Sequence, residues 1–195
     1  AQLIKDKNFI IYEHDHKYVA TRDPSKFSNF EIPRNLIINE DFYRAAKVVV
    51  VLSKICKDIL EKNISGVNVH NIGCSLWSSK KLDFIESLLG REKKEKFAIV
   101  DSPNPIKGTE EAKRICAGKN IDYDLIKISD HETFLTSLAS YEGLVFIPQV
   151  LETFSRISME AKMLGCKLVT KKSLIGMCSE QKLSSLTGID AIREI

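Results

Sequence analysis

The feature that most constrains the fold is the alternation of short apolar runs with longer helical segments along the 195 residues. Most of the runs are apolar at consecutive positions, as in the strands of a parallel sheet covered on both faces. Strands that alternate with helices form βαβ units, whose crossovers are right-handed. We therefore expect an α/β protein with a Rossmann-like parallel sheet and helices on both faces. The predicted strands are Phe9–Tyr12, Val48–Leu52, Val67–Ile72, Phe97–Asp101, Asp124–Ile128, Leu144–Ile147 and Lys167–Thr170.

The helices are placed between these strands by their capping residues. Asp130 is a good N-cap for the helix that follows it, and Gly118 and Gly165 are good C-terminal stops. The predicted helices are Leu36–Ala46, Lys54–Lys62, Leu82–Leu89, Thr109–Gly118, His131–Ser140 and Phe154–Leu164.

A break near residues 75–95 divides the chain. We expect a partial first domain over residues 1–75 and a second Rossmann-like domain over residues 95–195, where a new βαβ series begins at Phe97. In the second domain the expected strand order is 3-2-1-4 or an extension of it. The basic stretch Arg91–Lys96 is interleaved with acids and predicts a solvated linker.

Composition excludes several classes. Residues are 44% hydrophobic and 28% charged, as in ordinary globular domains, and the net charge of +3 is too small to indicate nucleic acid. No apolar run approaches the roughly 18 residues of a membrane span. Residues 1–12 lack a signal-peptide pattern, and five cysteines without C-x-x-C favour a reduced protein. We expect a cytoplasmic protein, compatible with weak attraction to anionic lipid head groups at the membrane surface.

Two glutamates, Glu152 and Glu160, follow the apolar run at Leu144–Ile147. The pattern predicts strand, loop and helix, with Glu152 in the loop and Glu160 two turns into the helix. Positions eight apart lie within roughly 80° of each other on a helix surface. Both carboxylates are then expected near one cleft at the carboxyl end of a strand, where open α/β sheets bind ligands. The alternative is two solvated surface glutamates.

The surrounding residues carry a family resemblance. Pro148, Glu152-x-Phe154-Ser155, Glu160-Ala161, Gly165-Cys-x-Leu-Val169 and Glu180 resemble the donor-binding signature of retaining GT-B glycosyltransferases of family 4, over about 35 residues. The resemblance implies a GT-B type fold with two Rossmann-like domains, of which this chain would hold an incomplete first one. Either the chain is a fragment or it is a trimmed homologue; its first residue, Ala1, is not a methionine.

The resemblance also implies roles for particular residues. Lys107 and Gly108 match a family element that holds the donor diphosphate, although Ser102 stands where that element has an arginine. A hydroxyl does not replace a bidentate arginine–phosphate contact. Arg156 is a substitute candidate for the phosphates. In the family, Glu152 would bind donor sugar hydroxyls and Glu160 the ribose hydroxyls.

Two further elements complete the predicted site. The helix that starts at Phe154 and Ser155 directs free N–H groups and a positive dipole end at the diphosphate. His14 matches a histidine that lies near the reacting sugar in the family; a metal bound by His14 and His16 is the weaker alternative, as is an ordinary surface role. Asp122-Tyr-Asp124 precedes a strand rather than following one, so we interpret it as a solvated loop and expect no metal.

The sequence thus predicts a retaining, metal-independent glycosyltransferase without a cofactor. Its donor is expected to be a nucleotide-diphosphate sugar, and its acceptor, a glycan, lipid or protein, is open. One alternative is a nucleotide-sugar-binding remnant or partner subunit without transfer activity, favoured by Ser102 and the incomplete first domain. A weaker alternative is a sugar-nucleotide isomerase of GT-B fold. We expect little or no transfer from this chain alone, because positioning by the acceptor side contributes much to catalysis.

Overall fold

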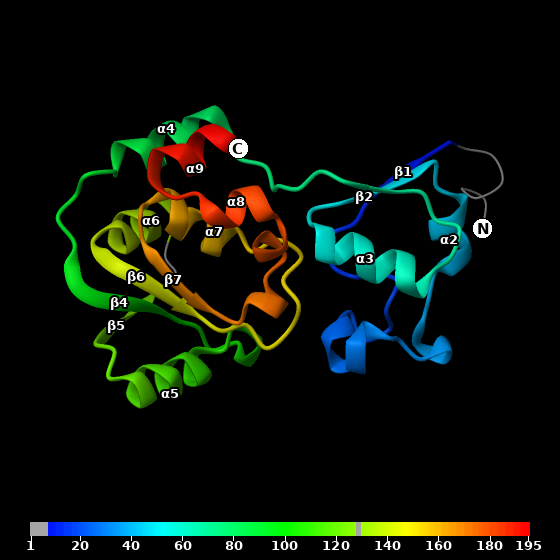
Figure 1. The fold of residues 1–195 in the computed structure, drawn as a ribbon, viewed down its shortest axis with the longest axis horizontal. Helices are drawn as coiled ribbons and strands as arrows, with labels where there is room; N and C mark the ends of the chain where they lie inside the picture. Colours follow the sequence, from blue (N-terminus) through cyan, green and yellow to red (C-terminus); the bar gives the residue numbers. More distant parts are fainter. Residues whose placement is uncertain (1–7, 128–129) are drawn as a thin grey trace.

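The computed structural model describes residues 8–127 and 130–195, which form two parallel sheets with helices packed against them (Figure 1). The first sheet has the order β1-β2-β3 and the second the order β5-β4-β6-β7. Every neighbouring pair is parallel. The predicted α/β class is therefore confirmed. The strands are β1 (Ile10–Tyr12), β2 (Val48–Val51), β3 (Val69–Asn71), β4 (Lys94–Asp101), β5 (Tyr123–Lys127), β6 (Tyr141–Phe146) and β7 (Lys167–Thr170).

Helices follow most of the strands. The α-helices are α2 (Glu40–Ala45), α3 (Lys54–Asn63), α4 (Ser79–Ser87), α5 (Thr109–Lys119), α6 (His131–Ala139), α7 (Arg156–Met163), α8 (Gln181–Ser185) and α9 (Gly188–Glu194). Short 3-10 helices lie at Pro24–Lys26, Ser28–Phe30, Arg34–Leu36, Pro105–Lys107, Lys172–Leu174 and Gly176–Ser179.

Several element ends differ from prediction. The helix expected from Leu36 begins only at Glu40, because Asn39 has a left-handed backbone (φ 58°). Helix α5 continues past the expected stop at Gly118 and ends at Lys119, where Asn120 caps it with a left-handed backbone (φ 52°). The Asp130 cap is confirmed, since its side chain accepts a hydrogen bond from the Thr133 amide at 2.9 Å. Residue 128, the expected end of one strand, lies outside the described residues, as do residues 1–7.

The expected strand order of the second sheet is wrong. The order 3-2-1-4 would put β5 inside the sheet and β6 at an edge. Instead β6 pairs with both β4 and β7, and β5 is the edge strand. The composition of the two strands explains this: β6 carries the fully buried Leu144 and Val145, whereas β5 carries Asp124 and an exposed Leu125.

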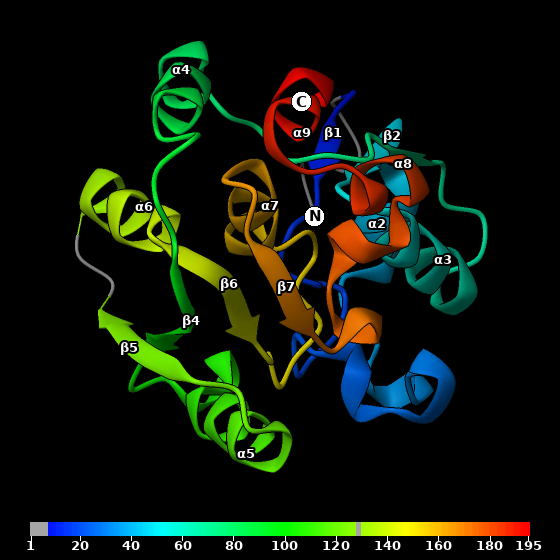
Figure 2. The same ribbon diagram turned by 60° about the vertical axis from the view of Figure 1, so that its left-hand side comes forward.

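The second sheet is covered on both faces (Figure 2). Val100 and Leu144 point into the core built with α6 and α7. Ile99 and Val145, on the opposite face, pack against Cys116 of α5. In the first sheet one face packs on α3, and Ile10 and Tyr12 on the other face are 63% and 45% exposed.

The prediction of a solvated linker at Arg91–Lys96 is wrong for the second half of that stretch. Strand β4 begins at Lys94. The Lys93 ammonium donates to the backbone carbonyls of Ala139, Tyr141 and Leu164 at 3.0–3.1 Å, so it binds the ends of neighbouring elements.

The chain crosses between the two sheets through residues 72–78 (Figure 1). The division into domains 1–75 and 95–195 stays a prediction.

The two sheet-bearing parts contact each other directly. Ser53, fully buried before α3, donates to the Thr153 carbonyl at 2.7 Å. The Glu180 carboxylate accepts from the Lys54 amide at the start of α3 and from the Asn71 amide group at 3.0 Å. These contacts hold the carboxyl ends of both sheets against one another. Within the described ranges, no helix is both long and apolar enough to cross a membrane.

Candidate functional site

The candidate site lies where the loops after β1, β4 and β6 converge. In the second sheet the chain reverses its direction of winding between β4 and β6, because β5 lies on one side of β4 and β6 on the other. Such a switch point, outside the carboxyl ends of the strands, is where open α/β sheets bind ligands. Lys107 follows β4 and Glu152 follows β6, so both residues stand at this point.

Gly108 brings the loop after β4 close to the loop after β6. It has φ 71°, and a Cβ on this residue would lie 1.7 Å from the Ile147 carbonyl oxygen. Only glycine fits such an approach. The Gln149 amide also donates to the Ile106 carbonyl at 2.8 Å. The predicted Lys107–Gly108 element is thereby held directly against the end of β6.

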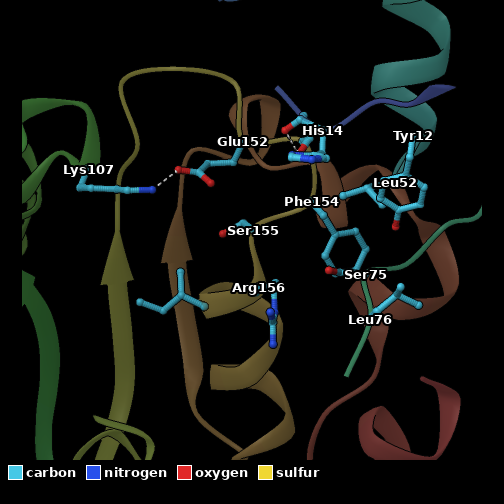
Figure 3. A pocket seen from close by; sticks show the side chains of 12 residues that line it. Tyr12, His14, Leu52, Ser75, Leu76, Lys107, Glu152, Phe154, Ser155 and Arg156 are labelled. Carbon is cyan, nitrogen blue, oxygen red and sulfur yellow. Dashed lines mark hydrogen bonds and ion pairs between the residues drawn. The ribbon is translucent and has the colours of Figure 1, made fainter. Parts of the chain in front are cut away.

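Lys107 and Glu152 form an ion pair. The Lys107 Nζ lies 2.8 Å from Glu152 Oε1 (Figure 3), and the two side chains are 36% and 20% exposed. Glu152 is held by its backbone, whose amide donates to the Leu174 carbonyl and whose carbonyl accepts from the Gly176 amide. A close cation and anion, both reachable from solvent, can exchange partners with a charged ligand.

Helix α7 begins at the same cleft. Ser155 precedes it with φ 72° and offers no side-chain cap, because its hydroxyl is hydrogen-bonded to that of Ser158 at 2.8 Å. The first amides of a helix lack intrahelical partners, and with the helix dipole they favour a bound anion. Arg156 and Ile157, the first residues of α7, line the cleft. This end of α7 suits a phosphate group.

His14, on the loop after β1, lines the same cleft and lies near Glu152 (Figure 3). Its side chain is half exposed, and its carbonyl accepts from the Thr153 hydroxyl at 3.2 Å. The loop is shaped by Glu13, a buried residue whose carboxylate accepts from the Asp15 amide at 2.7 Å and from the Tyr43 hydroxyl. Sequence reasoning missed Glu13; a buried acid beside the predicted histidine had no distinguishing pattern.

These loops enclose a cleft of about 500 Å³ (Figure 3). A second cleft of about 280 Å³ adjoins it and shares His14, Lys107, Glu152 and Thr153. Its other walls come mainly from the loop between β1 and Pro24 and from the loop after β6. The larger cleft is lined by Tyr12, His14, Leu52, Ser75, Leu76, Lys107, Glu152, Thr153, Phe154, Ser155, Arg156 and Ile157.

Glu160 does not line either of these clefts. Its side chain is only 4% exposed, and its Oε1 accepts from Trp77 Nε1 at 2.9 Å. His131 Nε2 lies 3.0 Å from the same oxygen, and an Arg156 Nη2 lies 3.7 Å away. Glu160 is thus neither a solvated surface residue nor open to a ligand in this conformation. Trp77, from the segment between the sheets, was not foreseen as its partner.

His16, next to the predicted His14, is buried at 2% exposure. Burial lowers the pKa of His16 to about 4, against the opposing effects of the Glu13, Asp23 and Asp15 carboxylates. The ring is therefore neutral at neutral pH. Its Nε2 has no hydrogen-bond partner in the described part of the chain.

The residues considered for a metal are not grouped as ligands. Across residues 8–127 and 130–195, no three His, Cys, Asp or Glu side chains lie together so that they could hold a metal ion. In the Asp-x-Asp sequence only Asp122 lies in the loop before β5. Asp124 belongs to β5, in agreement with the predicted strand, and pairs with Lys96 at 3.0 Å. This pair lowers the pKa of the Asp124 carboxyl.

The fold and the cleft together define an α/β protein with two parallel sheets and a polar cleft between their carboxyl ends. No family model matches the sequence, and no curated protein matches it. Among solved structures, the chain is similar to the pneumococcal O-GlcNAc transferase GtfA in complex with UDP and GlcNAc, at 14% identity and a TM-score of 0.44. The match covers 69% of this chain and 32% of that chain, so this chain spans about a third of the length of the structure it matches. A likeness of this degree does not bear on the function of the chain.

Proposed function

We propose that the larger cleft binds a nucleotide-diphosphate sugar and that the chain is the donor-binding part of a retaining glycosyltransferase of GT-B, family 4 type. One observation carries the proposal: Lys107, Glu152, His14 and the start of α7 line one cleft at a switch point. The sequence resemblance rests on the same residues but does not by itself bring them together.

The cleft offers two cationic groups and a helix end for a diphosphate. Lys107 and Arg156 both line it, and the first amides of α7 add their dipole. Negative charge grows on the diphosphate as the sugar departs, so these groups stabilise the leaving group in the transition state. Arg156 and the helix end take the place of the arginine that Ser102 does not provide.

Glu152 is proposed to bind sugar hydroxyls. In the structure its carboxylate is held by Lys107 at 2.8 Å. A diphosphate that attracts the lysine would free the carboxylate for hydroxyl groups beside it. His14, which lines the same cleft, would contact the same sugar. Glu160 is proposed to bind the ribose, which requires its present partners to move.

Thermal unfolding offers a direct test of binding. UDP-, GDP-, ADP- and dTDP-sugars are added separately to the chain, and one class should stabilise it. A ligand at 100 times its dissociation constant adds about 2.7 kcal/mol, or roughly 5–10 °C for a chain of this size. The proposal fails if none of the four stabilises the chain at millimolar concentration.

Variants then separate the roles. Glu152→Gln should weaken the nucleotide-sugar at least severalfold and leave the bare nucleoside diphosphate nearly unchanged. Lys107→Met should weaken both ligands, since it removes a phosphate contact. Lys80→Met, on the exposed side of α4, is the matched control and should change neither. Equal losses for both ligands in the Glu152→Gln variant would show that Glu152 does not recognise the sugar.

The second candidate is binding without transfer. It is favoured by Asp101 and Ser102, which stand where the family element has glycine and arginine. The test follows the release of labelled sugar over hours. A chain that binds the nucleotide-sugar but neither transfers nor hydrolyses it would support this candidate. Slow hydrolysis that is lost in the Lys107→Met variant would support the transferase.

A further inference from the structure

Trp77 packs against α7, although it belongs to the segment between the two sheets. It is the only tryptophan of the chain. Its Nε1 donates to Glu160 Oε1 at 2.9 Å, and its ring meets Phe154 edge-on, with centroids 6.1 Å apart. The Arg156 guanidinium lies over the indole, 5.1 Å from the ring centroid. The indole therefore contacts three residues of the loop and helix that form the candidate site.

The contacts of Trp77 are with the residues that a nucleotide would need. Arg156 is one of the two cations proposed for the diphosphate, and it is engaged by the indole and by Glu160 at 3.7 Å. The Glu160 side chain is 4% exposed, and its Oε1 already has a short contact with His131 besides Trp77. No ribose can reach this carboxylate while the indole stays in place.

The position of the larger cleft supports the same conclusion. Ser75 and Leu76, from the same segment as Trp77, line the larger cleft beside the start of α7 (Figure 3). Glu160 lies about one turn further along α7, on the side that Trp77 covers. A nucleoside whose ribose bonded Glu160 Oε1 would have to displace the Trp77 N–H from it.

We propose that Trp77 occupies the place of a nucleoside beside the larger cleft: its indole holds Glu160 and gives way to the ribose when a nucleotide binds. This inference rests on the proposed function. Because residues 72–78 connect the two sheets, release of the indole frees a segment that is tied to both.

The indole N–H gives a single cross-peak in a ¹⁵N–¹H spectrum, since the chain has one tryptophan. UDP, GDP, ADP and dTDP are titrated into the labelled protein, and binding is measured in parallel by calorimetry. The indole peak should shift with the calorimetric dissociation constant, and its exchange with water should accelerate as the bond to Glu160 is lost. A nucleotide that binds by calorimetry while the indole peak stays in place overturns the inference.

Trp77→Phe provides the second measurement. The ring is kept but the N–H that competes for Glu160 is lost, so affinity for the nucleoside diphosphate should rise about tenfold, as expected for a hydrogen bond to a charged group. Tyr123→Phe, which also removes one polar group from an aromatic ring but far from the cleft, is the matched control and should leave the affinity unchanged. Thermal unfolding of each variant confirms that it is folded.

The outcomes separate the two ideas. Binding to wild type with unchanged or lower affinity in Trp77→Phe overturns the inference and leaves the proposed function in place. Binding only to Trp77→Phe supports both, with the indole as the dominant competitor. If no nucleotide binds to either protein, the proposed function fails and the inference with it.

Discussion

Glu152 and Glu160 belong to one continuous loop and helix, yet their surroundings are opposite. Glu152 is 20% exposed, stands on the cleft wall and has the ammonium of Lys107 as its ion-pair partner. Glu160 is 4% exposed and meets an indole, an imidazole and a guanidinium. A charge on the wall can exchange its partner for a ligand at little cost, whereas a buried charge contributes to the fold and must be exchanged together with its partners.

The largest expected effect is a difference in the free energy of unfolding that is lost when each of the two glutamates is replaced. Glu160→Leu keeps the side-chain volume but leaves the part-buried indole N–H of Trp77 and the His131 ring without their acceptor. It should lower the free energy of unfolding by about 3 kcal/mol, or roughly 6–12 °C in Tm. Glu152→Leu, the matched control, should cost about 1 kcal/mol or less. Denaturant unfolding of both variants measures the difference; equal losses would break the comparison.

A pH titration sharpens the contrast for a second buried group, His16. Its pKa of about 4 in the folded chain lies below the ordinary value of 6.5, so the unfolded chain binds a proton more readily. The contribution of the neutral His16 ring to the free energy of unfolding is therefore fully present above pH 6.5 and is lost as the pH falls toward 4. The loss from this group is up to about 3 kcal/mol. Urea unfolding between pH 7 and pH 4 measures it.

The control for this titration lies on the first sheet. His16→Phe should flatten the dependence between pH 6.5 and 4, whereas His70→Asn, at an exposed position of β3, should leave it as in wild type. An unchanged slope in His16→Phe would mean that the carboxylates around the ring, and not the ring itself, dominate acid unfolding.

Features that depend on neighbouring residues could be predicted from the sequence, whereas features that depend on contacts between distant segments could not. The strands and their parallel pairing follow from local apolar runs. The Lys107–Gly108 element is predicted through the family resemblance alone, because the approach of Gly108 to the Ile147 carbonyl joins distant segments. The strand order was not recognised, because it depends on whether β5 or β6 is the better edge strand, a choice between distant segments. The Trp77–Glu160 contact spans 83 positions and leaves no local pattern. Buried partners of this kind are decided by tertiary packing.

Glu180 is a third glutamate to compare with Glu152 on the cleft wall and the buried Glu160. It contributes to the contact between the two sheets. Its carboxylate accepts from the Lys54 amide at the start of α3 and from Asn71. Glu180→Ala removes the acceptor at that helix start and should cost about 1–2 kcal/mol. Calorimetric unfolding should also become less cooperative, because this contact joins the two parts. Glu194→Ala, which removes a surface pair with Lys182 inside the second part, is the control and should do neither.

The smallest expected effect concerns the Lys107–Glu152 pair itself. The two side chains are 36% and 20% exposed, and pairs in contact with solvent typically contribute below about 1 kcal/mol. A double-mutant cycle with Lys107→Met and Glu152→Gln should therefore give a coupling energy for unfolding of about 0.5 kcal/mol, falling further in high salt. The same cycle for nucleotide-sugar affinity should give a larger coupling, because lysine and glutamate are proposed to contact adjoining parts of one ligand. A coupling above about 2 kcal/mol in unfolding would place Glu152 among the structural charges, beside Glu160, and remove the physical basis for assigning it to a sugar.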